Sequence, residues 1–149
     1  MSGRVLRVSS RIVLSLALFA WWATAPLGAQ GDPPCPPNSA AVTLTVDLDG
    51  GEIRVDPWSV EIVRPGKGDG ATNVCWQVAG LGSGHTLVLE GKAGDESYFP
   101  SLERTVKHPR SSARSGAPAK AGTWRYQLRL TDAEGATLLT LDPEVIIKG

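Results

Sequence analysis

Short segments in which apolar and polar residues alternate with a period of two dominate this sequence from Val42 onward. Such alternation puts every second side chain on one face of a strand and is typical of a half-buried sheet. The clearest example is the segment 124–130, where the apolar positions are Trp124, Tyr126, Leu128 and Leu130. After residue 30, no segment shows a sustained helical period with capping residues. The sequence therefore predicts an all-β fold.

Turn signals separate the alternating segments and set their number. Asp49-Gly50-Gly51 and the stretch 132–135 favour tight turns, and residues 65–70 and 80–84 are rich in Gly. The alternation predicts strands at 42–48, 53–55, 58–62, 74–78, 86–90, 124–130, 137–141 and 144–147, with a further short strand near 104–107. We therefore predict a Greek-key β-sandwich of about seven to eight strands over residues 41–149.

Residues 1–29 have the organisation of a secretory signal peptide. Arg4, Arg7 and Arg11 precede an apolar run over 12–22, and small residues follow up to Ala29. The apolar run is shorter than the ~20 residues of a membrane span. We expect cleavage after Ala29, a Pro-rich leader over 30–40, and export to the periplasm or the outside with no remaining span. An uncleaved anchor is the alternative.

Removal of the signal changes the charge balance. The chain has 15 basic and 15 acidic residues, three of the basic ones lie in the signal, and 12 against 15 gives the mature chain a net charge of −3. This balance points to no particular partner, and nucleic acid is not expected for an exported, net-acidic chain. About 120 residues remain, enough for one domain with one core.

The chain contains two cysteines, Cys35 and Cys75. An even pair in an exported protein predicts a disulfide. Closing a loop of this length would stabilise the fold by about 4 kcal/mol on the chain-entropy estimate. The alternative is a metal-binding or reactive thiol pair, but the spacing fits no zinc or redox motif.

Several segments, in their order along the chain, resemble the cupredoxin family. Residues 55–62 resemble its second-strand motif, in which a Pro precedes alternating apolar residues, and Gly68-Asp69 resembles the turn that follows. Trp76 ends the next strand as in that family, and residues 122–126 resemble its strand before the copper loop. The resemblance implies a cupredoxin-like sandwich.

The copper ligands of that family are missing from this sequence, although His85 falls where the family often places its first copper-binding histidine. A type-1 copper centre needs a thiolate and two imidazoles, usually with a weak axial Met. Leu128 stands at the position of the cysteine, Thr131 at that of the second histidine, and Met1 is the only methionine. The resemblance thus implies the fold without electron transfer, and we expect no cofactor.

A metal-handling protein is the alternative function, because His85 and His108 could bind copper or zinc with help from a carboxylate. The candidate carboxylates near His85 in sequence are Glu90, Asp95 and Glu96. Their spacing has no recognisable ligand pattern. The simpler interpretation places both histidines in exposed loops.

An enzyme is not expected. Nucleophilic catalysis needs a nucleophile, a base and an orienting group, and no Gly-x-Ser-x-Gly elbow occurs. Gly82-Ser83-Gly84 lacks the elbow spacing and is interpreted as a flexible turn.

A segment without acidic residues, from Arg104 to Thr131, is the most informative feature for function. Its candidate binding residues are Arg104, Lys107, Arg110, Arg114 and Lys120. They could bind an anionic envelope component, such as a glycan, or a protein partner. The alternative is a flexible solvated loop over 109–122.

The three tryptophans of the mature chain, Trp58, Trp76 and Trp124, are expected in the core because they lie on apolar strand faces. An exposed row of them would instead form a carbohydrate platform. The leading hypothesis from the sequence is a non-catalytic, exported binding or accessory module.

Overall fold

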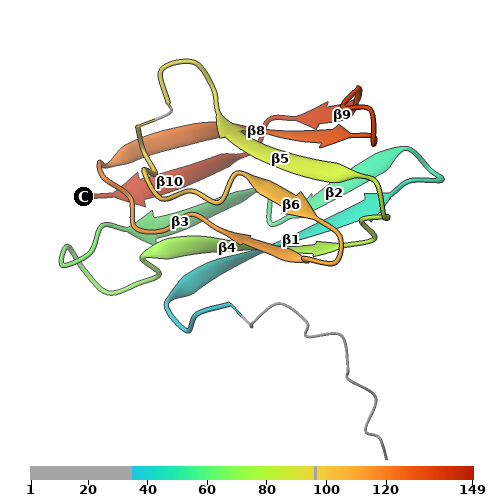
Figure 1. Ribbon diagram of the computed structural model, residues 1–149. Coiled ribbons are helices and arrows are strands. Elements are labelled where there is room, and N and C mark those ends of the chain that lie inside the picture. Colours follow the sequence, from blue (N-terminus) through green and yellow to red (C-terminus); the bar gives the residue numbers. More distant parts are fainter. Residues whose placement is uncertain (1–34, 96) are drawn as a thin grey trace, which may run out of the picture.

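The structure is a computed structural model that describes residues 35–95 and 97–149 (Figure 1). Two β-sheets pack face to face, which confirms the predicted all-β sandwich. The first sheet has the order β2 (Glu52–Asp56), β1 (Ser39–Asp47), β4 (Asn73–Ala79) and β7 (Ser112–Arg114). The second has the order β3 (Ser59–Val63), β10 (Glu144–Lys148), β8 (Gly122–Thr131), β5 (Thr86–Gly91) and β6 (Thr105–Lys107), with β9 (Thr137–Leu141) also paired to β8.

Parts of the predicted domain plan fall outside the described residues. The signal peptide over 1–29 and residues 30–34 of the leader are among them. The described part of the chain includes no helix of the length and apolar character needed to cross a membrane. The first described strand, β1, starts at Ser39.

The chain crosses between the sheets at both edges of the sandwich. At one edge, β2 of the first sheet continues into β3 of the second, and at the other edge β6 continues into β7. Within the sheets most neighbours are not consecutive, and β1 with β4 and β3 with β10 are parallel pairs. A parallel pair needs a long crossover connection, and in both pairs the chain forms other strands before the second partner is reached.

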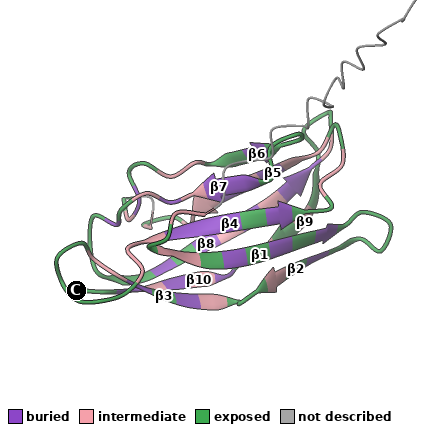
Figure 2. Ribbon diagram, turned by 90° about the horizontal axis from the view of Figure 1, so that it is seen from below, coloured by how far each residue is buried: buried purple, intermediate pink, exposed green. Residues whose placement is uncertain are grey.

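The predicted alternation buries one face of each long strand. In Figure 2, buried and exposed residues alternate along β1, where Val42, Leu44 and Val46 face the core. On the facing sheet, the cross-strand pairs Leu87–Leu130 and Leu89–Leu128 point inward. Because both sheets contribute an apolar face, the core lies between them over the whole length of the sandwich.

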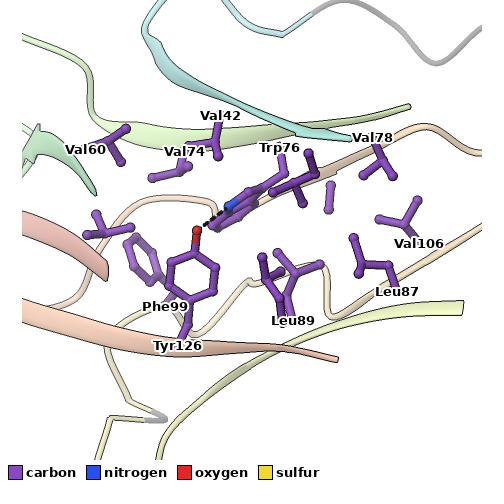
Figure 3. Packing of buried hydrophobic residues seen from close by; sticks show 14 of the residues in the cluster. Val42, Val60, Val74, Trp76, Val78, Leu87, Leu89, Phe99, Val106 and Tyr126 are labelled. Carbon is purple, nitrogen blue, oxygen red and sulfur yellow. Dashed lines mark hydrogen bonds between the residues drawn. The ribbon is translucent and has the colours of Figure 1, made fainter. Parts of the chain in front are cut away.

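Trp76, Phe99, Trp124 and Tyr126 are fully buried and form an aromatic cluster in the core, and Figure 3 labels all of them except Trp124. Trp124 stacks on Tyr126 with ring centroids 4.7 Å apart, and Phe99 meets Trp124 edge-on at 4.8 Å. Trp76 reaches them from the other sheet, and its Nε1–H donates a hydrogen bond of 3.0 Å to the Tyr126 hydroxyl. This bond satisfies two polar groups that would otherwise be buried without a partner.

The Tyr126 hydroxyl lowers the stability of the fold at alkaline pH, because burial raises the pKa of Tyr126 from its ordinary 10 to about 12. Above pH 10 the unfolded chain releases this proton before the folded one does. We therefore expect Tyr126 to make the free energy of unfolding fall by about 2 kcal/mol as the pH rises from 10 to 12. Chemical denaturation across this range measures it.

Tyr126→Phe is the matching control for this titration. The variant leaves the Trp76 N–H without its acceptor, so it should start about 1–3 kcal/mol less stable at neutral pH. Its further loss between pH 10 and 12 should be smaller than that of the wild type. Parallel curves for the two proteins would contradict the assignment.

Two expectations about the fold were wrong. Trp58 is 49% exposed rather than in the core, because it precedes β3 at the point where the chain changes sheets. Residues 109–122 are not simply a solvated loop, since β7 pairs with β4 there and Ala113 is fully buried. The described residues accordingly contain ten strands rather than seven to eight.

The predicted disulfide is confirmed. Cys35 and Cys75 are bonded, with their Cα atoms 5.7 Å apart and 40 positions apart in sequence. The bond ties the leader to the buried start of β4, next to the first residues of β1. A disulfide of this kind favours an oxidising compartment.

Candidate anion-binding site

Four of the five predicted basic residues lie along the edge of the sandwich where β6 passes into β7. Arg104 and Lys107 flank β6, Arg110 lies in the following turn, and Arg114 ends β7. We call these four residues the basic edge. Arg104 and Lys107 are exposed and Arg114 is half-buried. Strand β6 belongs to the second sheet and β7 to the first. The short connection between them crosses from one sheet to the other at this edge.

Glu103 is the one carboxylate that contacts this edge among the described residues. Its Oε1 accepts a bond of 3.2 Å from the Arg110 guanidinium, and its Oε2 accepts the Arg114 backbone N–H at 2.8 Å. The Glu103 N–H donates in turn to the Arg114 carbonyl at 2.8 Å. Glu103 therefore fastens the two strands together and balances part of the charge of Arg110.

The remaining cations of the basic edge are not balanced in this way. Within residues 35–95 and 97–149, the side chains of Arg104, Lys107 and Arg114 form no ion pair. Three of the four cations at the basic edge thus have no ion-pair partner within the described part of the chain. A surface with this excess attracts anions.

Lys120, the fifth predicted residue, does not join the basic edge. Its Nζ lies 4.1 Å from the centre of the Tyr98 ring, a cation–π contact. The loop that carries it leads into β8 at the end of the sandwich near the C-terminus, away from the β6–β7 turn (Figure 1). Arg125 and Arg129, on the outer face of β8, form ion pairs with Asp95 and Glu90.

The carboxylates predicted as partners of His85 are elsewhere. Glu90 lies five positions along the extended strand β5, roughly 16 Å away, and is paired with Arg129 at 3.1 Å. An oxygen of Asp95 accepts the Arg125 backbone N–H at 3.0 Å. Glu96 lies outside the described residues. Over the described ranges, no three His, Cys, Asp or Glu residues are grouped so that they could hold a metal ion.

Sequence reasoning missed the residue that does lie near His85. A hollow of about 260 Å³ at the end of the second sheet is lined by His85, Lys107, His108 and Asp132, among others. Thr86 pairs with Lys107 on β6 and with Thr131 on β8, so His85 lies between His108 and Asp132. Only the strand register reveals this, because the three residues are far apart in sequence.

The two positions that the resemblance assigned to copper ligands have structural roles. Leu128 is fully buried on the inner face of β8. Thr131 is 7% exposed, and its hydroxyl donates a hydrogen bond of 3.3 Å to the Thr86 carbonyl. An apolar side chain and a satisfied hydroxyl provide neither the thiolate nor the imidazole of a type-1 site.

Comparison with known proteins gives little beyond the fold described above. No protein-family model matches the chain, and no curated protein matches it. Among solved structures, the chain is similar to a crystal structure of a variant of rusticyanin, with 18% identity over 76% of this chain and 79% of that one. The TM-score of this match is 0.32, and we base no argument on it. The sandwich assignment rests on the sheet pairing itself.

Proposed function

We propose that this protein is a non-catalytic exported module, a copper-free relative of the cupredoxin sandwich, that binds an acidic glycan along the basic edge. The observation that carries the proposal is the excess of positive charge at this edge, where the exposed Arg104 and Lys107 and the half-buried Arg114 have no ion-pair partner in the described chain. Export is supported by the signal-like N-terminus and the Cys35–Cys75 disulfide.

A linear polyanion suits this edge better than a membrane or a protein surface. Membrane-binding surfaces and the centres of protein interfaces present large apolar side chains. The large exposed apolar residues of the described chain, Leu48, Trp58 and Leu138, all lie outside the β6–β7 edge. The basic edge offers positive charge instead, with Arg104 directly before β6 and Lys107 at its end, about 10 Å apart along the backbone.

Protection against aggregation is the other use of charged edge residues. In this protein Glu103 already occupies both backbone hydrogen-bonding groups of Arg114. A further strand therefore cannot pair with the backbone of Arg114, and the cationic side chains are not needed to prevent such pairing. Their charge is left to act on a ligand.

The proposal predicts that neutralising the basic edge weakens glycan binding. Replacing Arg104, Lys107 and Arg114 with Ser should reduce affinity for dextran sulfate and polygalacturonate about tenfold or more, since every 1.4 kcal/mol is a factor of ten. Titration calorimetry at about 0.05 M salt, where the charges are weakly screened, measures the effect. Uncharged dextran serves as the ligand control.

The matched control removes the same charge elsewhere. Replacing Arg54, Lys67 and Lys148 with Ser also removes three positive charges from exposed positions. We expect this variant to lose no more than about threefold in affinity, through the weaker overall field alone. Equal losses in the two triple variants, or no binding by the wild type, would contradict the proposed function.

A further inference from the structure

The hollow at the end of the second sheet adjoins the basic edge, because Lys107 belongs to both and His108 follows it in the chain. It lies one position beyond the last paired row of β6, β5 and β8, so His108, His85 and Asp132 are neighbours across three chain segments. Side chains adjacent in such a row have Cβ atoms about 5 Å apart. Its volume of about 260 Å³ corresponds to roughly nine water molecules in the liquid.

The carboxylate of Asp132 does not balance this hollow fully, because it is used by the turn between β8 and β9. Its Oδ1 accepts the backbone N–H groups of Glu134 at 3.1 Å and Ala136 at 2.7 Å. Lys107 and His108 have no ion pair or hydrogen bond from their side chains within the described residues. The charged side of the hollow is therefore available to a ligand.

His85 adds a hydrogen-bond donor. Its Nδ1 is buried without a hydrogen-bond partner in the described part of the chain, on the side of the ring that faces Gly82. We assign the ring hydrogen of His85 to Nε2, because a buried N–H without an acceptor is rarer in proteins than a buried acceptor without a donor. The Nε2–H group is thus left to donate to a molecule in the hollow.

Three side chains with nitrogen donors therefore line the hollow, namely those of Lys107, His85 and His108. A sulfate or phosphate ester has three free oxygen atoms to accept them, whereas a carboxylate has two. We propose that the hollow binds one sulfate or phosphate ester group of the glycan that lies on the basic edge. This proposal rests on the proposed function and adds the chemical class of the ligand.

Comparing two polymers tests the proposal. The wild type should bind dextran sulfate at least about fivefold more tightly than polygalacturonate, whose acid groups are carboxylates, at equal charge concentration. His108→Ala should lower that ratio towards one, and because His108 is exposed we expect the variant to fold. Arg104→Ala, on the basic edge but outside the hollow, should weaken the binding of both polymers by the same factor. The ratio of the two affinities should therefore stay as in the wild type.

A second measurement reports on the hollow directly. Inorganic sulfate and inorganic phosphate, added in separate titrations, should shift the ring NMR signals of His85 and His108, whereas chloride at equal ionic strength should not. The two titrations also distinguish a sulfate site from a phosphate site. His85→Asn should remove its own signal and reduce the shift of His108.

The outcomes separate this inference from the proposed function. Equal affinity for both polymers together with unshifted histidine signals would overturn the inference and leave glycan binding along the basic edge intact. Failure of the wild type to bind either polymer would overturn both. A preference for dextran sulfate that survives His108→Ala would also overturn the inference, because the hollow would then not be its source.

Discussion

Trp124→Ala is expected to lower the free energy of unfolding by about 3–5 kcal/mol, the largest effect of any single substitution considered for this protein. Trp124 is 1% exposed, stacks on Tyr126 and meets both Phe99 and Trp76 edge-on. Its removal takes away this contact surface and leaves a cavity that the two packed sheets can only partly close. Urea denaturation followed by circular dichroism measures the loss.

Trp58→Ala is the matched control, because it removes the same side chain from a position that is 49% exposed. We expect a change of less than about 1 kcal/mol there. Equal destabilisation by the two substitutions would mean that Trp58 contributes to the core and that its placement at the sheet crossing is incorrect.

Loss of the disulfide should be nearly as costly. Replacing Cys35 with Ser and Cys75 with Ala should destabilise the domain by about 4 kcal/mol, because the unfolded chain regains the freedom of a loop that spans 40 positions. Alanine is chosen at position 75 because that side chain is fully buried and a hydroxyl would need a partner. The midpoint of urea denaturation measures the change.

Chemical reduction separates this effect from repacking. The wild type treated with a thiol reductant should approach the stability of the double variant, and the same reductant should leave the double variant unchanged. A reduced wild type as stable as the oxidised protein would show that the bond does not contribute.

Local alternation was sufficient to predict most strands, because each carries its own period-two pattern. It failed where a pattern is interrupted or too short. Trp58 lies an even number of positions before Val60 and Ile62, so the alternation predicted that it faces the core with them. The chain changes sheets just before β3, however, and the alternation does not extend back to Trp58. Strand β7 has three residues, too few to show a period, and is held in place by β4 and Glu103.

The candidate site was predictable in composition but not in geometry. The absence of acidic residues from 104 to 131 identified the basic residues. The contacts that decide their use come from other strands, as with Asp132 beside His85 and Tyr98 beneath Lys120. Such contacts depend on register between distant segments, and a single sequence without strand pairing does not contain that information.

The position of β10 between β3 and β8 has a consequence for how the chain reaches its native state. Ser59 of β3 pairs with Glu144 of β10, and its hydroxyl donates a hydrogen bond to the Glu144 carboxylate. These two residues are 85 positions apart in the sequence. Folds built on such distant pairings have high contact order and form slowly. The second sheet therefore stays incomplete until β10, its last described strand, has been synthesised, and the two-sheet core cannot close before then.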